Sequence, residues 1–226
     1  MGKNIVAIPD IHFPGHDQKA VGKLLKALPT WAPGHVVILG DLLDLYGCSK
    51  FDANEPVPWD LKHELELAGK FLQRLRNLAP KAQIHLCEGN HEMRLRKYLC
   101  RRAKELFALD QVTIPAMLKL PSLGISWIPE GRRLNLQGID FTHGWVARQA
   151  PGSSAWGQLQ KTHFQRSVVV GHCHRLAQIH VGEHLFGIEA GWLGDEAHPA
   201  FDYHRGGGWC KGYAVIENGQ PRLVRL

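Results

Sequence analysis

In the stretch Ile84-His85-Leu86-Cys87-Glu88-Gly89-Asn90-His91-Glu92, a polar motif over 89–92 follows an apolar run over 84–87. The run has the length and composition of a buried β-strand, and the apolar spacing over 93–107 predicts an amphipathic helix immediately afterwards. In sheets with helices packed outside, functional side chains gather at the carboxyl ends of strands, where loops bring distant residues together. The stretch therefore predicts a strand, a functional turn and a helix in succession.

Four more polar motifs occupy the same position behind a predicted strand. They are Asp10-Ile11-His12 after 5–8, Gly40-Asp41-Leu42-Leu43-Asp44 after 36–39, His143-Gly144 after 139–142, and Gly171-His172-Cys173-His174 after 168–170. Each motif on its own has an ordinary structural explanation as a turn, a helix N-cap or a buried histidine. The occurrence of all five in order instead indicates one composite metal site.

Helical and extended patterns alternate in the first half of the chain, and short strands dominate the second half. Besides the elements above, the sequence predicts helices over 18–28 and 61–78 and strands over 125–128, 134–142, 177–181, 185–189, 213–217 and 223–225, with a hairpin turn at Asn218-Gly219. We therefore expect a single domain over residues 1–226 of the α/β (α+β) class, with two packed sheets and helices outside. Long loops at 48–59 and 192–211 are expected to be functional.

The composition of this 226-residue chain is that of an ordinary globular protein, with 44% hydrophobic and 21% charged residues. No apolar stretch is long enough to cross a bilayer and no signal peptide precedes the first strand, so we expect no membrane association. Scattered cysteines without a Cys-x-x-Cys pair favour a reducing compartment, which makes the cytoplasm the predicted location. A net charge of +6 favours anionic partners but does not by itself establish nucleic-acid binding. Nothing in the sequence indicates an oligomeric state.

The motifs supply enough metal-binding side chains for two ions. The candidate ligands are Asp10, His12, Asp41, Asn90, His143, His172 and His174. All of them offer nitrogen or oxygen, which suits Mn, Fe, Zn, Co or Ni. His172 and His174 would share one face of an extended segment, with Cys173 pointing away as a small buried residue. Two divalent ions, two aspartates and a bridging hydroxide keep a net charge of about +1, which attracts a phosphate group.

In this order the motifs resemble those of the calcineurin-like metallophosphoesterase superfamily, namely Asp-x-His, Gly-Asp-x-x-Asp, Gly-Asn-His-Glu, His and Gly-His-x-His. The resemblance spans residues 10–174 and implies a four-layer β-sandwich of two mixed sheets flanked by helices. It also implies a first metal held by Asp10, His12, Asp41 and His174, and a second held by Asp41, Asn90, His143 and His172. The stretch 88–94 looks most similar to compact phage and prophage members.

By the same resemblance, a metal-bound hydroxide attacks phosphorus in line, and His91 donates a proton to the leaving oxygen. Asp44 resembles the carboxylate that orients this histidine and keeps it protonated, and a helix N-cap is its alternative role. Glu92 is explained equally well as a cap of the following helix or as a support for the site.

Position 44 separates branches of the superfamily. Purple acid phosphatases have tyrosine there and double-strand-break repair nucleases usually have histidine, whereas Asp44 is similar to protein phosphatases and small nucleotide phosphodiesterases. Protein phosphatases follow this aspartate with a phosphate-binding arginine, where this chain has Leu45, and they lack the Gly-His-x-His pair. These differences argue against a dedicated phosphoserine phosphatase.

The candidate substrate contacts are Asn90, Arg94 and Trp145. Arg94 also belongs to a basic face of the predicted helix, together with Lys97, Arg101 and Lys104. This face either steers a polyanion toward the site or is an ordinary solvated surface. Trp145 and Trp192 follow two of the predicted strands, where either could stack a base or pack in the core.

The sequence thus predicts a dinuclear-metal-dependent phosphoric ester hydrolase acting on phosphodiesters or phosphomonoesters, with nucleotides or nucleic acid as the favoured substrates. One alternative is a broad-specificity phosphatase whose substrates include phosphoproteins. Another is a non-catalytic metal-binding scaffold of the same fold, which one retromer subunit exemplifies. A nucleic-acid-binding module without chemistry would explain the basic helix but not the ordered ligands.

Overall fold

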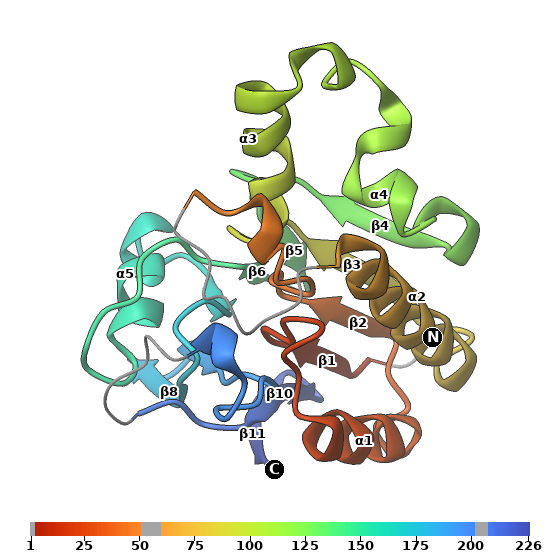
Figure 1. Cartoon of the computed structure of the whole chain (residues 1–226). Helices are drawn as coiled ribbons and strands as arrows, with labels where there is room; N and C mark the ends of the chain where they lie inside the picture. The colour runs from red at the N-terminus through yellow and green to blue at the C-terminus, as the bar shows by residue number, and fades with distance from the viewer. Residues whose placement is uncertain (1–2, 51–59, 202–207) are drawn as a thin grey trace.

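The computed structural model describes residues 3–50, 60–201 and 208–226, which form two packed sheets with helices on their outer faces (Figure 1). The first sheet has the order β11-β10-β1-β2-β3-β4, with β1 (Ile5–Ile8), β2 (His35–Ile38), β3 (Gln83–Cys87), β4 (Ile125–Ile128), β10 (Gly212–Glu217) and β11 (Gln220–Arg225). The second has the order β5-β6-β7-β9-β8, with β5 (Leu134–Leu136), β6 (Ile139–Thr142), β7 (Ser167–Val170), β8 (Leu176–Val181) and β9 (Leu185–Ala190). Both sheets are mixed, because β1–β4 and β6-β7-β9 pair in parallel and the remaining strands pair antiparallel.

The helices are α1 (Gln18–Ala27), α2 (Leu61–Leu78), α3 (Glu92–Arg102), α4 (Ile114–Met117) and α5 (Ser153–Lys161). Short 3-10 turns lie at η1 (Leu28–Trp31), η2 (Tyr46–Cys48), η3 (Lys104–Leu106), η4 (Asp110–Val112), η5 (Pro121–Leu123) and η6 (Pro199–Phe201). Asp17 and Asp60 start α1 and α2, since each side chain accepts hydrogen bonds from two backbone N–H groups of the first turn. The predicted helix over 61–78 is confirmed residue for residue.

Alternation along the strands creates the four layers. In β1, Val6 and Ile8 join the apolar cluster beneath α1 and α2, whereas Ile5 and Ala7 point between the sheets. A smaller cluster packs Ala155 of α5 against the outer face of the second sheet. The predicted four-layer arrangement of two mixed sheets flanked by helices is therefore confirmed, and α5 lies on the opposite side of the molecule from α1 and α2 (Figure 1).

Two predicted elements were longer than those in the structure, and the strand predicted over 223–225 starts earlier, at Gln220. The strand over 134–142 is two strands, because Gln137 and Gly138 both have positive φ (54° and 80°) and form a two-residue hairpin turn between β5 and β6. The helix over 93–107 ends at Arg102, because Ala103 leaves helical geometry (φ −150°, ψ 60°). Lys104 therefore lies in η3 and not on the predicted basic helical face.

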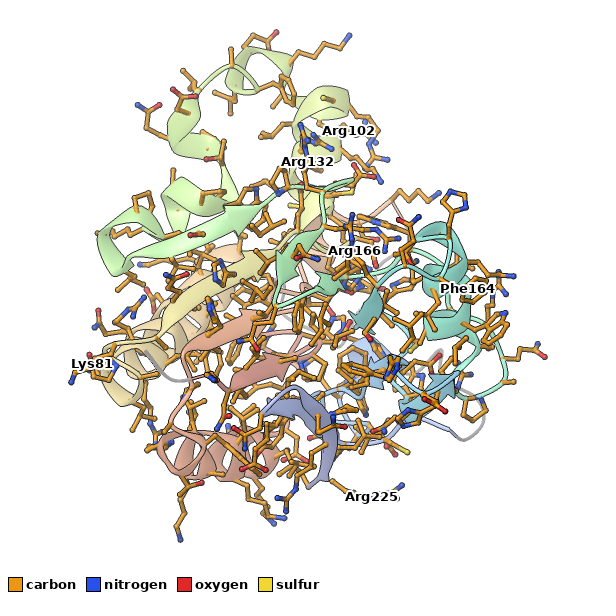
Figure 2. The ribbon with its side chains drawn as sticks, turned by 180° about the vertical axis from the view of Figure 1, so that it is seen from behind. Lys81, Arg102, Arg132, Phe164, Arg166 and Arg225 are labelled. Carbon is orange, nitrogen blue, oxygen red and sulfur yellow. The ribbon has the colours of Figure 1, made fainter. Side chains whose placement is uncertain are left out.

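The polar character of β6 is explained by an internal ion pair. Asp140 is buried, and its carboxylate accepts a 2.7 Å hydrogen bond from Asn135 Nδ2 across the hairpin. Arg166, which directly precedes β7, places Nη1 3.3 Å from Asp140 Oδ1 (Figure 2). These partners compensate the buried charge at the end of the second sheet that is remote from His143.

Two further sequence expectations concern long segments. Residues 51–59 and 202–207, which fall in the expected functional loops, lie outside the described part of the chain. Within the described residues, no helix is both long enough and apolar enough to span a bilayer.

Candidate metal centre

The five polar motifs converge at one edge of the molecule. The strands β1, β2 and β3 run in parallel, as do β6 and β7, so their carboxyl ends open toward the same region. All seven candidate ligands lie there, contributed by both sheets. The geometry therefore brings together residues that are far apart in the sequence, such as His12 and His174, which are separated by 162 positions.

A first group consists of Asp10, His12 and His174, whose ligand atoms lie within 4.8 Å of one another. His12 Nε2 and His174 Nε2 are 3.1 Å apart, and all three residues are buried. Both carboxylate oxygens of Asp10 accept the backbone N–H of His172, at 2.9 and 3.0 Å, and this contact fixes the orientation of the carboxylate.

A second group consists of Asp41, His143 and His172, whose ligand atoms also lie within 4.8 Å of one another. Asn90 joins it, since Asn90 Oδ1 lies 2.9 Å from His143 Nε2. Asp41 Oδ2 lies 3.4 Å from His143 Nε2 and 3.9 Å from His12 Nε2. Asp41 is thus placed between the two groups, where one carboxylate can serve both.

Three of the four candidate imidazoles are in the form that binds metals, and His143 is the exception. Its Nδ1 donates to the Leu39 carbonyl at 3.0 Å and its Nε2 donates to Asn90 Oδ1 at 2.9 Å. Burial lowers the pKa of His143, but Asp41 raises it to about 9, so a metal ion at Nε2 would have to replace this proton. Burial lowers the pKa of His12 and His174, and it lowers the pKa of His172 to about 4, so these rings are neutral near pH 7. Neutral imidazole is the form that binds metals.

Unsatisfied polar atoms also point to a missing partner in this region. Among the described residues, His12 Nδ1 and His174 Nδ1 are buried without a hydrogen bond. Burial raises the pKa of Asp10 to about 7, although His143 acts in the opposite direction. A buried carboxylate beside converging imidazoles is costly unless a cation compensates it. The donor set is nitrogen and oxygen only, because burial raises the pKa of the Cys173 thiol to about 12 and keeps it protonated. These residues fit divalent transition-metal ions.

The backbone around the site is unusual. His12, Asp41, His172 and His174 all have positive φ (57°, 50°, 67° and 57°) although none is glycine. The expectation that His172 and His174 share one face of an extended segment was wrong, since the chain turns at Cys173, whose N–H donates to the Gly171 carbonyl. The turn sends His172 to the second group and His174 to the first. Such strained positions persist where the surroundings fix them, and they cluster at functional sites.

His91 lies beside the ligands with both ring nitrogens engaged. Nδ1 donates to the Asp44 main-chain carbonyl at 2.8 Å, whereas the nearer carboxylate oxygen of Asp44 is 3.7 Å away. Asp44 is buried and caps no helix, because η2 begins after Leu45 without a side-chain cap. Burial would raise the pKa of Asp44, but His91 and His12 hold it well below its usual range. The orienting role of Asp44 is therefore carried mainly by its backbone.

Arg94 belongs to this cluster and not to the solvated face of α3. Its Nη1 donates to the Asp44 carbonyl at 2.8 Å and to Asp44 Oδ1 at 3.0 Å, and its Nη2 lies 3.0 Å from His91 Nε2. Lys97 and Arg101 are exposed, and Arg102 at the end of α3 projects outward in Figure 2. The shared basic face predicted for this helix is thus divided between the site and solvent.

The sequence as a whole matches the calcineurin-like phosphoesterase family over residues 3–218. The chain belongs to this family. Comparison with curated protein sequences gives no match. Among solved structures, a hypothetical protein, PH1004, from Pyrococcus horikoshii OT3 has 11% identity and a TM-score of 0.57, covering 99% of this chain and 87% of that one. The likeness supports the shared fold.

Two other similar structures have lower TM-scores. YfcE, a phosphoesterase from E. coli, has 16% identity and a TM-score of 0.45, with 95% of this chain and 88% of that chain covered. Vps29 from Chaetomium thermophilum has 11% identity and a TM-score of 0.48, with 99% and 96% covered.

A cavity of about 650 Å³ opens beside the candidate ligands. Its lining includes Asn90, His91 and Arg94, as well as Arg175 and Trp209, which the sequence analysis did not single out. Arg175 directly follows the last motif, and Trp209 lies in the loop over 192–211 that was expected to be functional. These positions in the sequence were the signals that could have identified Arg175 and Trp209 as residues of the site.

The two tryptophans considered for base stacking have other contacts. Trp192 is fully buried and stacks on His174, with ring centroids 5.1 Å apart and planes at 12°. Trp145 meets His143 edge-on at 5.8 Å and is not among the residues that line the cavity. Trp209 contacts His174 edge-on at 4.4 Å and does line it. Of the three, Trp209 is the one available to a ligand in the cavity.

Gly89 is expected to be irreplaceable for packing reasons. A Cβ atom there would lie 2.2 Å from Asp41 Oδ1 and 2.4 Å from Asp41 N, so Gly89→Ala should lower the free energy of unfolding by about 3 kcal/mol. Gly22→Ala is the matched control: it lies inside α1 with nothing within 4 Å of the added atom and should raise stability by about 0.5–1 kcal/mol. Urea denaturation measures both, and equal effects would contradict the close approach.

Proposed function

We propose that this member of the calcineurin-like phosphoesterase family is a two-metal hydrolase of phosphate esters. Asp10, His12, Asp41 and His174 would hold one divalent transition-metal ion, and Asp41, Asn90, His143 and His172 the other. The observation that carries the proposal is the position of Asp41 between two buried ligand groups at the wall of a cavity. When bound, such ions supply an activated water for attack and neutralise charge on the phosphoryl group.

The protein's own groups then handle the proton and the substrate. His91 Nε2 lies 3.8 Å from Asp41 Oδ2, so a proton on Nε2 is available to a leaving oxygen at the ligand groups. In the resting geometry Arg94 Nη2 donates to this nitrogen, which must then be unprotonated. Substrate phosphoryl oxygens would draw the Arg94 guanidinium away, and Asp41 and Asp44, which raise the pKa of His91 against the effect of burial, favour its protonation.

The substrate class we favour is a nucleotide or nucleic acid. The cavity has a volume in the usual range for small-molecule ligands, and it presents two guanidinium groups, Arg94 and Arg175, beside the candidate ligands. Arginine pairs well with phosphate, and Trp209 offers an aromatic surface for a base. The similarity of residues 88–94 to compact phage members and the cytoplasmic location remain predictions.

Metal removal and reloading test the proposal. Chelator-treated protein is expected to be inactive, and reloading with Mn, Zn, Fe, Co or Ni should restore hydrolysis of bis-p-nitrophenyl phosphate or a cyclic nucleotide. His172→Ala should bind less metal, whereas His184→Ala, at an exposed histidine in the turn after β8, should bind as much as the wild type. Full metal binding without hydrolysis of any phosphate ester would instead indicate a scaffold. A strong preference for p-nitrophenyl phosphate would indicate a broad-specificity phosphatase.

A further inference from the structure

Buried glutamates hold the segment that carries Asp41 and Asp44. Three alternate N–H groups of this segment donate to side-chain carboxyl groups. Asp41 N and Leu43 N donate to Glu92 at 2.9 and 3.1 Å, and Leu45 N donates to Glu64 at 2.8 Å. Glu92 comes from α3 and Glu64 from α2, and both are buried. The segment is therefore fixed from two helices by two separate acids.

Glu92 links the two loops that supply Asp41 and Asn90. Its Oε2 accepts the Asp41 N–H and also the Gly89 N–H at 2.9 Å, while Oε1 accepts the Leu43 N–H. Asp41 has a φ of 50°, a conformation that a residue other than glycine keeps only when its surroundings impose it. Three hydrogen bonds to one buried carboxylate provide that constraint, and they set the position of Asp41 between the ligand groups. Of the two roles expected for Glu92, these contacts favour the support of the site: α3 has no side-chain cap, and the third N–H belongs to Gly89, which precedes the helix.

Glu64 acts on a different peptide group. The N–H of Leu45 and the carbonyl of Asp44 belong to the same peptide plane, and this carbonyl accepts both the His91 Nδ1 proton and Arg94 Nη1. Leu45 also has positive φ (51°), so the direction of this plane depends on the hydrogen bond to Glu64. Bonds at the two ends of one peptide strengthen each other.

We propose that Glu92 and Glu64 are positioning residues with separate tasks: Glu92 fixes Asp41 for metal binding, and Glu64 fixes the peptide that orients His91. The inference rests on the proposed function, because the tasks are defined by the metal centre and by the proton donor. Neither acid lines the cavity. Within the part of the chain that the structure describes, the hydrogen bonds that Glu92 and Glu64 accept come from backbone N–H groups.

The Glu92 half is tested by metal affinity, which requires no substrate. Glu92→Gln replaces one acceptor oxygen by an N–H₂ group, so at least one of the three backbone donors loses its partner. Calorimetric titration with Mn²⁺ should show binding weakened about 10–100-fold. Glu92→Asp keeps the charge but shortens the side chain and should give a smaller loss. Glu105→Gln, at an exposed position in η3, should bind Mn²⁺ like the wild type. Circular dichroism of the apo-proteins identifies folded samples, and a lower melting temperature with unchanged Mn²⁺ affinity would make Glu92 merely structural.

The Glu64 half is tested by leaving-group dependence. Glu64→Ala should leave Mn²⁺ affinity within about twofold of the wild type but lower kcat on phenyl phosphate esters about tenfold, a part of the 10²–10⁴ that general acid catalysis contributes. With p-nitrophenyl esters the loss should nearly vanish. Glu64→Gln retains an acceptor oxygen and should restore the wild-type ratio, and Glu66→Ala, exposed on the same helix, is the control.

Failure of this inference can be told apart from failure of the proposed function. Equal losses on both leaving groups, or weakened metal binding in Glu64→Ala, would overturn the assignment of Glu64. If the wild type hydrolyses no ester, the proposed function fails. The role of Glu64 can still be tested by nuclear magnetic resonance, because the nitrogen resonances of the His91 imidazole report its hydrogen bond to the Asp44 carbonyl. Glu64→Ala should shift the Nδ1 resonance, while an unchanged spectrum would overturn the role of Glu64.

Discussion

Asp41→Asn is expected to lower kcat/KM on a phosphate ester about a thousandfold, which corresponds to about 4 kcal/mol of lost transition-state stabilisation. Asp41 Oδ1 accepts the His91 backbone N–H at 2.9 Å, so an asparagine would keep its oxygen there and turn its N–H₂ group toward His143 and His12. The place of Asp41 Oδ2 between the two ligand groups would then be taken by an N–H₂ group, which cannot bind a cation. Both ions should be lost or bound more weakly together, because Asp41 belongs to both proposed ligand sets.

Metal analysis after equilibration with limiting Mn²⁺, together with kcat/KM, measures this effect. Asp110→Asn removes the same charge at an exposed position and should change neither quantity. If Asp41→Asn kept two ions at wild-type affinity, the residue would not be shared between the sites. If it lost one ion only, Asp41 would belong to a single site and the other group would need a different carboxylate.

His91→Ala is expected to keep its metals and to lose about two to four powers of ten in rate on a substrate with a poor leaving group. The expected loss is much smaller with p-nitrophenolate, which leaves without protonation. Asp44→Asn should have the milder effect, because the Nδ1 proton of His91 is accepted by the Asp44 carbonyl, which the substitution preserves. Its main consequence should be the loss of the negative charge beside Arg94 and His91, since an asparagine oxygen can still accept the 3.0 Å hydrogen bond from Arg94 Nη1.

Steady-state rates over a series of aryl esters, with metal content measured on the same samples, separate the possible roles of His91. A loss of equal size across the series would show that the imidazole binds phosphoryl oxygens and does not donate a proton. Metal loss in His91→Ala would make it a ligand, which is chemically feasible because His12, Asp44 and His91 also lie within 4.8 Å of one another.

The sequence predicted the convergence of the motifs well because strand direction decides it. Once 5–8, 36–39 and 84–87 are parallel strands of one sheet, the polar residues behind them must meet at one edge. The exact course of the chain behind each strand was less predictable. The turn at Cys173, which sends His172 and His174 to different groups, depends on positive φ values that their residue types do not suggest.

Contacts that depend on packing between distant elements were the least predictable. For Glu92 the sequence left a helix cap and a support for the site equally open, because the residues it supports, Asp41 and Leu43, lie about fifty positions earlier. Glu64 gave no signal, since an acid in an amphipathic helix is ordinary unless the helix is known to cover a loop. The same holds for Trp209, whose place in the cavity follows from its contacts with His174 and Trp192.

The candidate ligands are divided unequally between the sheets. Both carboxylates follow strands of the first sheet, whereas three of the four imidazoles follow strands of the second. Metal ions bound to these residues would connect the two sheets, because neither sheet alone holds a complete ligand set. Binding energy would then add to the cohesion of the sandwich, in proportion to the free metal concentration. Metal supply would thereby govern the lifetime of the folded chain as well as its turnover.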